Sequence, residues 1–310
     1  MEANGNMRLY HLRRWPFVAR RCKGCFQKVA YYVPPLLVDA IRHLASEWEY
    51  LPQGWHDGDP ALSGWNDQSV AAAQEKHWPI LVRNLHGPGP LGVSHFPWSS
   101  TREDRADHNA MMTYGYVLAR AARKKHRLSI LDWGGGVGHY YLYSKALVPE
   151  VEIDYHCYDL PALCAAGRKL LPDVQFHDDA SDLFERRFDL IVSSSSLQYF
   201  EDWRTVLRKL ATTTGDFLYI ARLPTVSREP SFVVAQTPYH AGYYTQYRGW
   251  FLNRQELLAC AGEAGMELER EFVFAEEWHV RGAPEKGECR GFLLRRAVPT
   301  SPQRAGERQE

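Results

Sequence analysis

LDWGGGVGHYY, residues 131–141, is the stretch on which the fold prediction depends. An apolar run ends at Asp132, glycines follow at positions 134, 136 and 138, and the sequence then becomes helical in character. Glycines at a strand-to-helix turn allow a tight backbone turn and leave no Cβ in the way of a ligand. The stretch therefore predicts a ligand-binding loop at the carboxyl end of the first strand of a βαβ unit.

Outward from this loop, short apolar runs alternate with helical stretches, which is typical of an α/β protein with a mostly parallel sheet. We expect a Rossmann-like sheet of seven strands with helices on both faces. The predicted strands cover residues 128–132, 151–159, 174–177, 188–194, 216–223, 267–274 and 289–296. The predicted helices between them cover residues 139–146, 161–171, 202–211 and 253–262.

The chain before this domain has a different texture. Residues 30–126 are expected to form a mainly helical cap region, with helices over 35–45, 68–85 and 107–126 and loops over 48–64 and 86–100. Asn66 or Asp67 is placed to cap the second of these helices. The predicted organisation is a basic arm (1–29), the helical region (30–126), the α/β domain (127–297) and a polar, disordered tail (298–310).

Composition excludes several classes of protein. The 310 residues include 37 basic and 37 acidic side chains, and this zero net charge argues against a nucleic-acid binder. Six scattered cysteines favour a reducing, cytoplasmic setting. Apolar runs stay well short of the roughly 18 residues that a membrane-spanning helix needs.

The N-terminal arm is the one strongly charged stretch. Between Met7 and Val38 there are seven Lys or Arg residues and no carboxylate, with aromatic and aliphatic side chains interleaved. Such a segment could lie peripherally on the anionic inner face of a membrane. Pro16 interrupts the helix that this would require, which favours a solvated arm instead. Cys22 and Cys25 lack a second ligand pair at zinc spacing, so no metal is predicted.

Three details of the glycine loop limit what it can bind. His139 stands where a dinucleotide-binding G-x-G-x-x-G would place its third glycine, and the phosphate-binding G-x-x-x-x-G-K-[ST] is absent. The loop carries no Lys or Arg to meet a pyrophosphate. Asp159 closes the next strand 21 residues after Gly138, where a carboxylate can accept hydrogen bonds from ribose hydroxyls. These features favour a nucleoside ligand without phosphates, namely S-adenosylmethionine.

Three motifs now carry a resemblance. Asp132-Trp-Gly-Gly-Gly-Val-Gly138 resembles the D/E-x-G-x-G-x-G first motif of class I S-adenosylmethionine-dependent methyltransferases. Asp159-Leu-Pro161 is similar to the acidic end of that family's second strand, and FDLIVSSSSLQYFEDW (188–203) resembles its fourth motif. This resemblance covers about residues 127–296. More narrowly, WEYLPQGW (48–55) and the first and fourth motifs look like a bacterial methyltransferase family found among surface-polysaccharide genes.

The resemblance implies roles around the glycine loop. Gly134, Gly136 and Gly138 would line the cofactor, and Asp159 would hold its ribose. Asp132 would either bond near the amino group of the cofactor or order the loop.

Further cofactor contacts are implied beyond the loop. Leu160 would pack on the adenine, and Asp178 or Asp179 would meet the adenine amino group, the other of the two being a helix cap. Ser194 and Ser195 would border the methionine portion.

The acceptor site is expected in TPYHAGYYTQYRGW, residues 237–250, a loop-like insertion. Methyl transfer needs in-line alignment, and a sugar hydroxyl also needs a general base. His240 is the first candidate base, ahead of His139 and His108. In the related family His often stands where Gln198 and Tyr199 are found, so no base is assigned there. Aromatic side chains suited to stacking on a sugar or an aromatic ring, or else to core packing, are Tyr199, Tyr239, Tyr243, Tyr244, Tyr247 and Trp250.

The resemblance implies an S-adenosylmethionine-dependent methyltransferase acting on a hydroxyl of a sugar or other small molecule in cell-surface polysaccharide synthesis. A phenol or amine methyltransferase is the second hypothesis, because Asp159-Leu-Pro161 also occurs in small-molecule O-methyltransferases. A binding or scaffold protein without turnover is the third.

Overall fold

The computed structural model describes residues 46–55, 64–92, 105–238, 243 and 245–297. The basic arm, the helix expected over 35–45 and the polar tail lie outside these residues. In the part of the chain that is described, no helix is long and apolar enough to cross a membrane.

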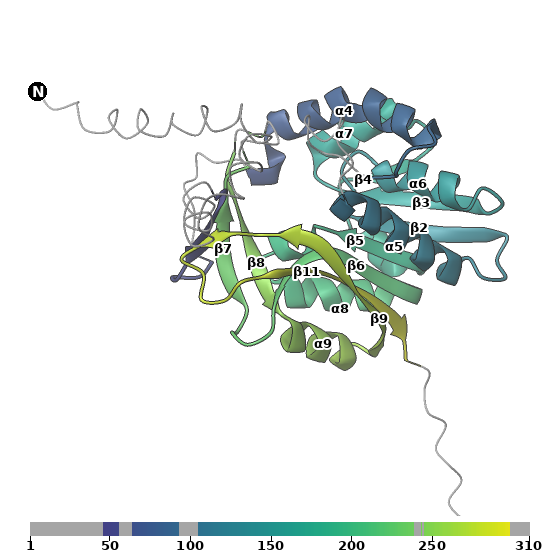
Figure 1. Ribbon diagram of the computed structural model, residues 1–310. Helices are drawn as coiled ribbons and strands as arrows, with labels where there is room; N and C mark the ends of the chain where they lie inside the picture. The colour runs from purple at the N-terminus through teal and green to yellow at the C-terminus, as the bar shows by residue number, and fades with distance from the viewer. Residues whose placement is uncertain (1–45, 56–63, 93–104, 239–242, 244, 298–310) are drawn as a thin grey trace, which may run out of the picture.

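A sheet in the order β4-β3-β2-β5-β6-β11-β9 forms the centre of the molecule (Figure 1). Strands β4 to β6 pair in parallel, and β11 is antiparallel to both β6 and β9. The prediction of a mostly parallel, seven-stranded Rossmann-like sheet is confirmed for this part. Its strands are β2 (Arg127–Trp133), β3 (Glu152–Tyr158), β4 (Gln175–His177), β5 (Phe188–Ser194), β6 (Thr214–Val226), β9 (Met266–Glu277) and β11 (Glu288–Arg296).

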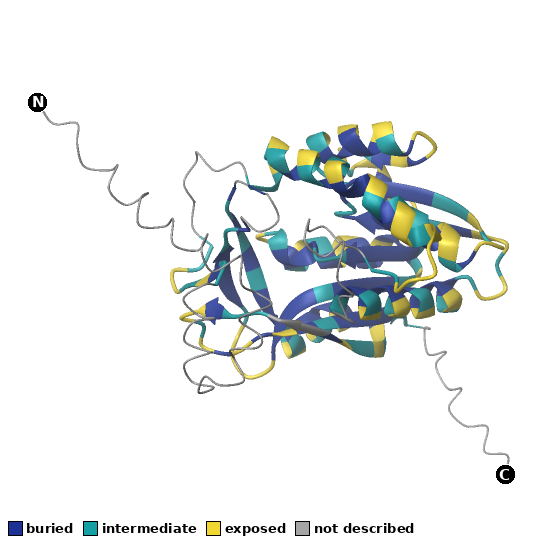
Figure 2. Cartoon of the chain, turned by 45° about the horizontal axis from the view of Figure 1, so that its top comes forward, coloured by how far each residue is buried: buried dark blue, intermediate teal, exposed yellow. Residues whose placement is uncertain are grey.

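Helices cover both faces of this sheet. Leu190 and Ile191, adjacent in β5, belong to two different apolar cores, because successive strand side chains point to opposite faces. One core is shared with α4, α5, α6 and α7, the other with α8 and α9. Figure 2 shows the strands largely buried and the outer helix faces exposed. The helices are α4 (Gln68–His86), α5 (Arg105–Ala121), α6 (His139–Leu147), α7 (Pro161–Leu170), α8 (Trp203–Thr213) and α9 (Arg254–Glu263).

Four further strands extend the sheet in the order β10-β1-β7-β8: β1 (Trp48–Leu51), β7 (Phe232–Gln236), β8 (Tyr247–Asn253) and β10 (Val280–Arg281). Thr225 and Val226, at the end of β6, pair with the end of β8 and join this extension to the central sheet. The prediction of loops over 48–64 and 237–250 is therefore wrong for residues 48–51, which form β1, and for residues 247–250, which begin β8. These strands form because their apolar side chains meet distant partners, such as Trp48 against Phe251 with ring centroids 5.9 Å apart.

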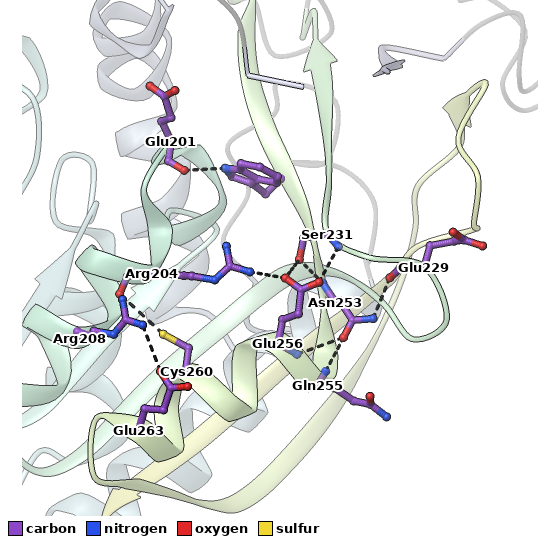
Figure 3. A network of polar contacts seen from close by, with 11 residues as sticks. Glu201, Arg204, Arg208, Glu229, Ser231, Asn253, Gln255, Glu256, Cys260 and Glu263 are labelled. Carbon is purple, nitrogen blue, oxygen red and sulfur yellow. Dashed lines mark hydrogen bonds and ion pairs between the residues drawn. The ribbon is translucent and has the colours of Figure 1, made fainter. Parts of the chain in front are cut away.

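A polar network fastens the extension to α8 and α9 (Figure 3). Arg204 of α8 pairs with Glu256 of α9, whose carboxylate also accepts hydrogen bonds from the Ser231 backbone N–H (3.2 Å) and hydroxyl (3.0 Å). Asn253 caps α9 by accepting from the N–H groups of Gln255 and Glu256. Asn253 is thus the N-cap of α9, and Glu256 links this helix to the segment directly before β7.

Candidate functional site

The glycine loop after β2 has the backbone geometry that its sequence predicts. Gly134, Gly136 and Gly138 have φ values of +74°, +62° and +88°, in the left-handed region where a side chain is strained. A Cβ on Gly134 would lie 2.4 Å from the Cβ of Ser196, so the loop packs against the segment that follows β5. Gly138 is the N-cap residue of α6.

Asp159, directly after β3, is hydrogen-bonded to this loop. Its Oδ2 accepts from the backbone N–H of Gly136 and its Oδ1 from that of Leu160, both at 2.7 Å. Burial raises the pKa of the carboxyl to about 6, and the two N–H groups partly oppose that rise. Each carboxylate oxygen keeps a further lone pair, which can accept from a ribose hydroxyl.

Asp132 lies beneath the loop. It is fully buried, accepts a hydrogen bond from the Tyr155 hydroxyl on β3, and its Oδ1 has no partner among the described residues. Burial raises the pKa of this carboxyl to about 7. A Cβ on Gly135 would lie 2.3 Å from Asp132 Oδ2, so the carboxyl supports the loop from below.

The two aspartates after β4 differ in their contacts. Asp179 Oδ1 accepts from the backbone N–H (3.0 Å) and the hydroxyl (2.8 Å) of Ser181, and these hydrogen bonds lower the pKa of Asp179. Asp178 pairs with Arg168 at 3.6 Å. Asp179 thus occupies a turn-capping position, which leaves Asp178 as the candidate for the adenine amino group. Leu160 is half-buried at the N-cap position of α7.

Two residues, one directly after β5 and one within β6, have an unfavourable backbone conformation. Ser195 and Arg222, neither of them glycine, have φ values of +52° and +51°. The Ser195 backbone N–H donates to the Ala221 carbonyl at 2.9 Å, so the two residues lie on neighbouring chain segments. Ser194 accepts a 2.8 Å hydrogen bond from the Tyr140 hydroxyl. Backbone strain of this kind concentrates at functional sites.

Arg222 also forms a largely buried ion pair. Its Nη1 lies 3.1 Å from Oδ1 of Asp107 in the first turn of α5, and the two side chains are only 14% and 11% exposed. Neither residue was predicted from the sequence, because Arg222 stands inside a predicted strand without any motif around it.

An aromatic cluster of Trp65, Tyr199, Tyr243 and Tyr247 lies beside the fourth motif. The Trp65 ring centroid is 4.3 Å from that of Tyr247, 4.9 Å from that of Tyr199 and 5.9 Å from that of Tyr243. Three of the aromatic residues predicted for the acceptor site, Tyr199, Tyr243 and Tyr247, are thereby brought together. Trp65 was missed, because it stands alone in a Gly- and Asp-rich stretch. Of the remaining predictions, His240, Tyr239 and Tyr244 lie outside the described residues.

The two other candidate bases are described. His139 opens α6, where burial lowers its pKa to about 4 and its ring centroid lies 5.5 Å from that of Trp78. His108 Nδ1 lies 3.2 Å from the Leu91 carbonyl oxygen. Among the described residues, no group of three or more His, Cys, Asp or Glu is placed to hold a metal ion.

This site fits a cationic nucleoside without phosphates. The glycine loop presents backbone rather than side chains to a ligand, and the Asp159 carboxylate supplies negative charge beside it. The loop itself contains no cationic side chain that would bind a phosphate. A mostly parallel sheet with such a loop after its first central strand defines a Rossmann-like class I methyltransferase fold.

Comparison with known proteins gives the family. The model for a methyltransferase domain matches residues 107–270, more than half of the chain, and the protein therefore belongs to that family. It is an S-adenosylmethionine-dependent methyltransferase. None of the curated proteins compared with the chain matches it.

Solved methyltransferase structures are similar at low identity. The 1,6-didemethyltoxoflavin-N1-methyltransferase of Burkholderia thailandensis, solved with S-adenosylhomocysteine, is 17% identical, with 79% of this chain and 94% of that chain covered and a TM-score of 0.43. An O-methyltransferase family protein of the same organism is 14% identical (85% and 84% covered, TM-score 0.44). A methyltransferase of Clostridium acetobutylicum is 9% identical (65% and 95% covered, TM-score 0.42).

Proposed function

We propose that the protein methylates a hydroxyl group of a small-molecule acceptor, in the first place a sugar or sugar-lipid of cell-surface polysaccharide synthesis. The aromatic cluster is the observation that supports the placement of the acceptor site. Tyr199 ends the segment that begins at Ser194, so the cluster adjoins the residues expected beside the methionine portion of the cofactor. The polysaccharide context is supported by the sequence resemblance alone.

The cofactor, when bound, supplies an electrophilic methyl group on a sulfonium. The glycine loop and Asp159 hold it, and Ser194 and Ser195 border its methionine portion. The half-buried rings of Trp65 and Tyr199 would stack on the apolar face of a sugar and exclude water from it, and the buried rings of Tyr243 and Tyr247 pack behind them. We propose His240 as the base that removes the hydroxyl proton. His139 is neutral at pH 7, as a general base must be, because burial lowers its pKa to about 4. The same burial separates it from an acceptor, so His240 is preferred.

A phenol is the second candidate acceptor, because the half-buried rings of Trp65 and Tyr199 are also complementary to an aromatic ring. A phenol also needs less help in losing its proton. The two candidates predict different dependence on the base: His240→Ala would abolish methylation of a sugar and only slow that of a phenol.

The test is transfer of radiolabelled methyl groups to a panel of methyl glycosides, lipid-linked sugars, phenols and amines. We expect Trp65→Ala to raise the KM for the acceptor about tenfold, with the affinity for S-adenosylhomocysteine unchanged. Tyr116→Ala, an exposed aromatic on α5, is the matched control. An unchanged KM in Trp65→Ala would remove the cluster from the acceptor site. Cofactor binding without transfer to any acceptor would favour the scaffold hypothesis.

A further inference from the structure

Gln74 of α4 is a buried polar side chain that the proposed function does not use. Only 6% of the residue is exposed, and its Oε1 has no hydrogen-bond partner among the described residues. A buried acceptor without a partner destabilises a protein by about 1–3 kcal/mol, so it calls for an explanation. Helix α4 also precedes the region that the methyltransferase domain model matches.

The unpartnered oxygen faces the cofactor loop. A Cβ built on Gly136 would lie 2.7 Å from Gln74 Oε1. The backbone N–H of the same glycine donates to Asp159 Oδ2 at 2.7 Å. Gln74 and Asp159 therefore approach one loop residue, Gly136, and both present oxygen acceptors near it.

The nitrogen of the same amide faces the aromatic cluster, where the methyl acceptor is proposed to bind. The Gln74 side chain is hydrogen-bonded to the Tyr243 hydroxyl. Because Oε1 has no partner, Nε2 is the donor of this bond. Tyr243 belongs to the aromatic cluster, with its ring centroid 5.9 Å from that of Trp65.

We infer that Gln74 is a cofactor-binding residue whose Oε1 accepts a hydrogen bond from a ribose hydroxyl while Nε2 holds Tyr243 in place. A ribose offers two neighbouring hydroxyl donors, and the carboxylate of Asp159 and the amide of Gln74 provide one acceptor group for each. One side chain then contacts the cofactor and positions a ring of the acceptor site. This inference rests on the proposed placement of the ribose at Asp159.

The experiment compares S-adenosylhomocysteine with its 2′,3′-dideoxyribose analogue by calorimetric titration. In Gln74→Met, which keeps the length of the side chain without its polar atoms, we expect affinity for S-adenosylhomocysteine to fall about tenfold. Affinity for the analogue should equal that of the wild type, because the contact with the hydroxyl is already absent. Tyr243→Phe should bind S-adenosylhomocysteine within twofold of the wild type. The control is Gln255→Met, on the exposed side of α9.

Folding is checked separately. Gln74→Met removes an unpartnered buried oxygen but also the hydrogen bond to the buried Tyr243 hydroxyl, so the stability of each variant in urea is measured before its titration, and Gln74→Ala provides a second variant. Equal affinity of both variants and the wild type for S-adenosylhomocysteine would overturn the inference, as would equal losses for the two ligands. A folded wild type that binds S-adenosylhomocysteine but does not distinguish it from the analogue would contradict the ribose placement itself. A wild type that binds neither ligand would contradict the cofactor assignment.

Discussion

The carboxylate of Asp159 accepts the backbone N–H of Gly136 at 2.7 Å, which fastens the end of β3 to the loop that follows β2. The two residues are 23 positions apart in the sequence, and together they form the part of the site proposed for the ribose.

Replacement of Asp159 should weaken cofactor binding. Hydrogen bonds to a charged group contribute about 1.5–3 kcal/mol, so Asp159→Ala should lower the affinity for S-adenosylmethionine roughly 10- to 100-fold. Asp173→Asn, at an exposed position, is the control in the same calorimetric titration. Unchanged affinity in Asp159→Ala would show that the ribose is bound elsewhere.

Cofactor affinity should also depend on pH. Burial raises the pKa of Asp159 to about 6, and a ribose hydroxyl binds its ionised form better. Below about pH 6, protons compete with the ligand, so the affinity for S-adenosylhomocysteine should fall as the pH is lowered from 7 to 5. The titration is repeated with Asp159→Asn, which has no proton to gain there. A decline of the same size in that variant would assign the effect to another group.

Asp132 should make the unliganded protein less stable at high pH. Burial raises its folded-state pKa to about 7 from 3.8. The folded protein therefore retains this proton longer than the unfolded chain, and stability is lost as the pH rises from about 4 to about 7. In urea unfolding, Asp132→Asn should gain about 2–3 kcal/mol more over the wild type at pH 8 than at pH 5. A gain that does not vary with pH would argue that Asp132 titrates normally.

A side chain in the loop should not be tolerated. Gly134→Ala places a Cβ 2.4 Å from that of Ser196 at a φ of +74°, and we expect both lower stability and loss of cofactor binding. Gly262 is the control, because a Cβ there meets nothing within 4 Å and the residue lies in α9. Gly262→Ala should stabilise the protein by about 0.5–1 kcal/mol. Normal binding by Gly134→Ala would mean that the loop can move away.

The strain at Ser195 can be measured with two variants. Ser195→Gly and Ser195→Ala both lose the hydrogen bond from Gln198 Nε2, and only glycine is unstrained at a φ of +52°. The glycine variant should therefore be about 1 kcal/mol more stable to urea than the alanine variant. Equal stabilities would show that Ser195 is not strained.

The central sheet was predictable because its signals are local. LDWGGGVGHYY combines a buried strand, positive-φ glycines and a helix start within 11 residues, and Asp67 caps α4 through its own side chain. By contrast, the four residues of β1 become a strand only by pairing with β7 and β10.

The same contrast between local signals and distant contacts explains which residues of the site could be predicted from the sequence. Asp159 was predictable because it ends the next strand, 21 residues after Gly138 in the sequence. Trp65, Gln74 and Arg222 have no local pattern, and their roles follow from contacts with residues distant in the chain: Tyr247, Tyr243 and Asp107. Asp178 and Asp179 could not be told apart by sequence, because their difference lies in the Arg168 and Ser181 contacts.

Calorimetric titration of the purified protein with S-adenosylmethionine and, separately, with NAD tests the central claim most directly. The loop carries neither a third dinucleotide glycine nor a cation for a pyrophosphate. We predict saturable binding of S-adenosylmethionine alone, in the micromolar range and of order −8 kcal/mol. Saturable binding of NAD, or no heat with S-adenosylmethionine from a folded protein, would contradict the account.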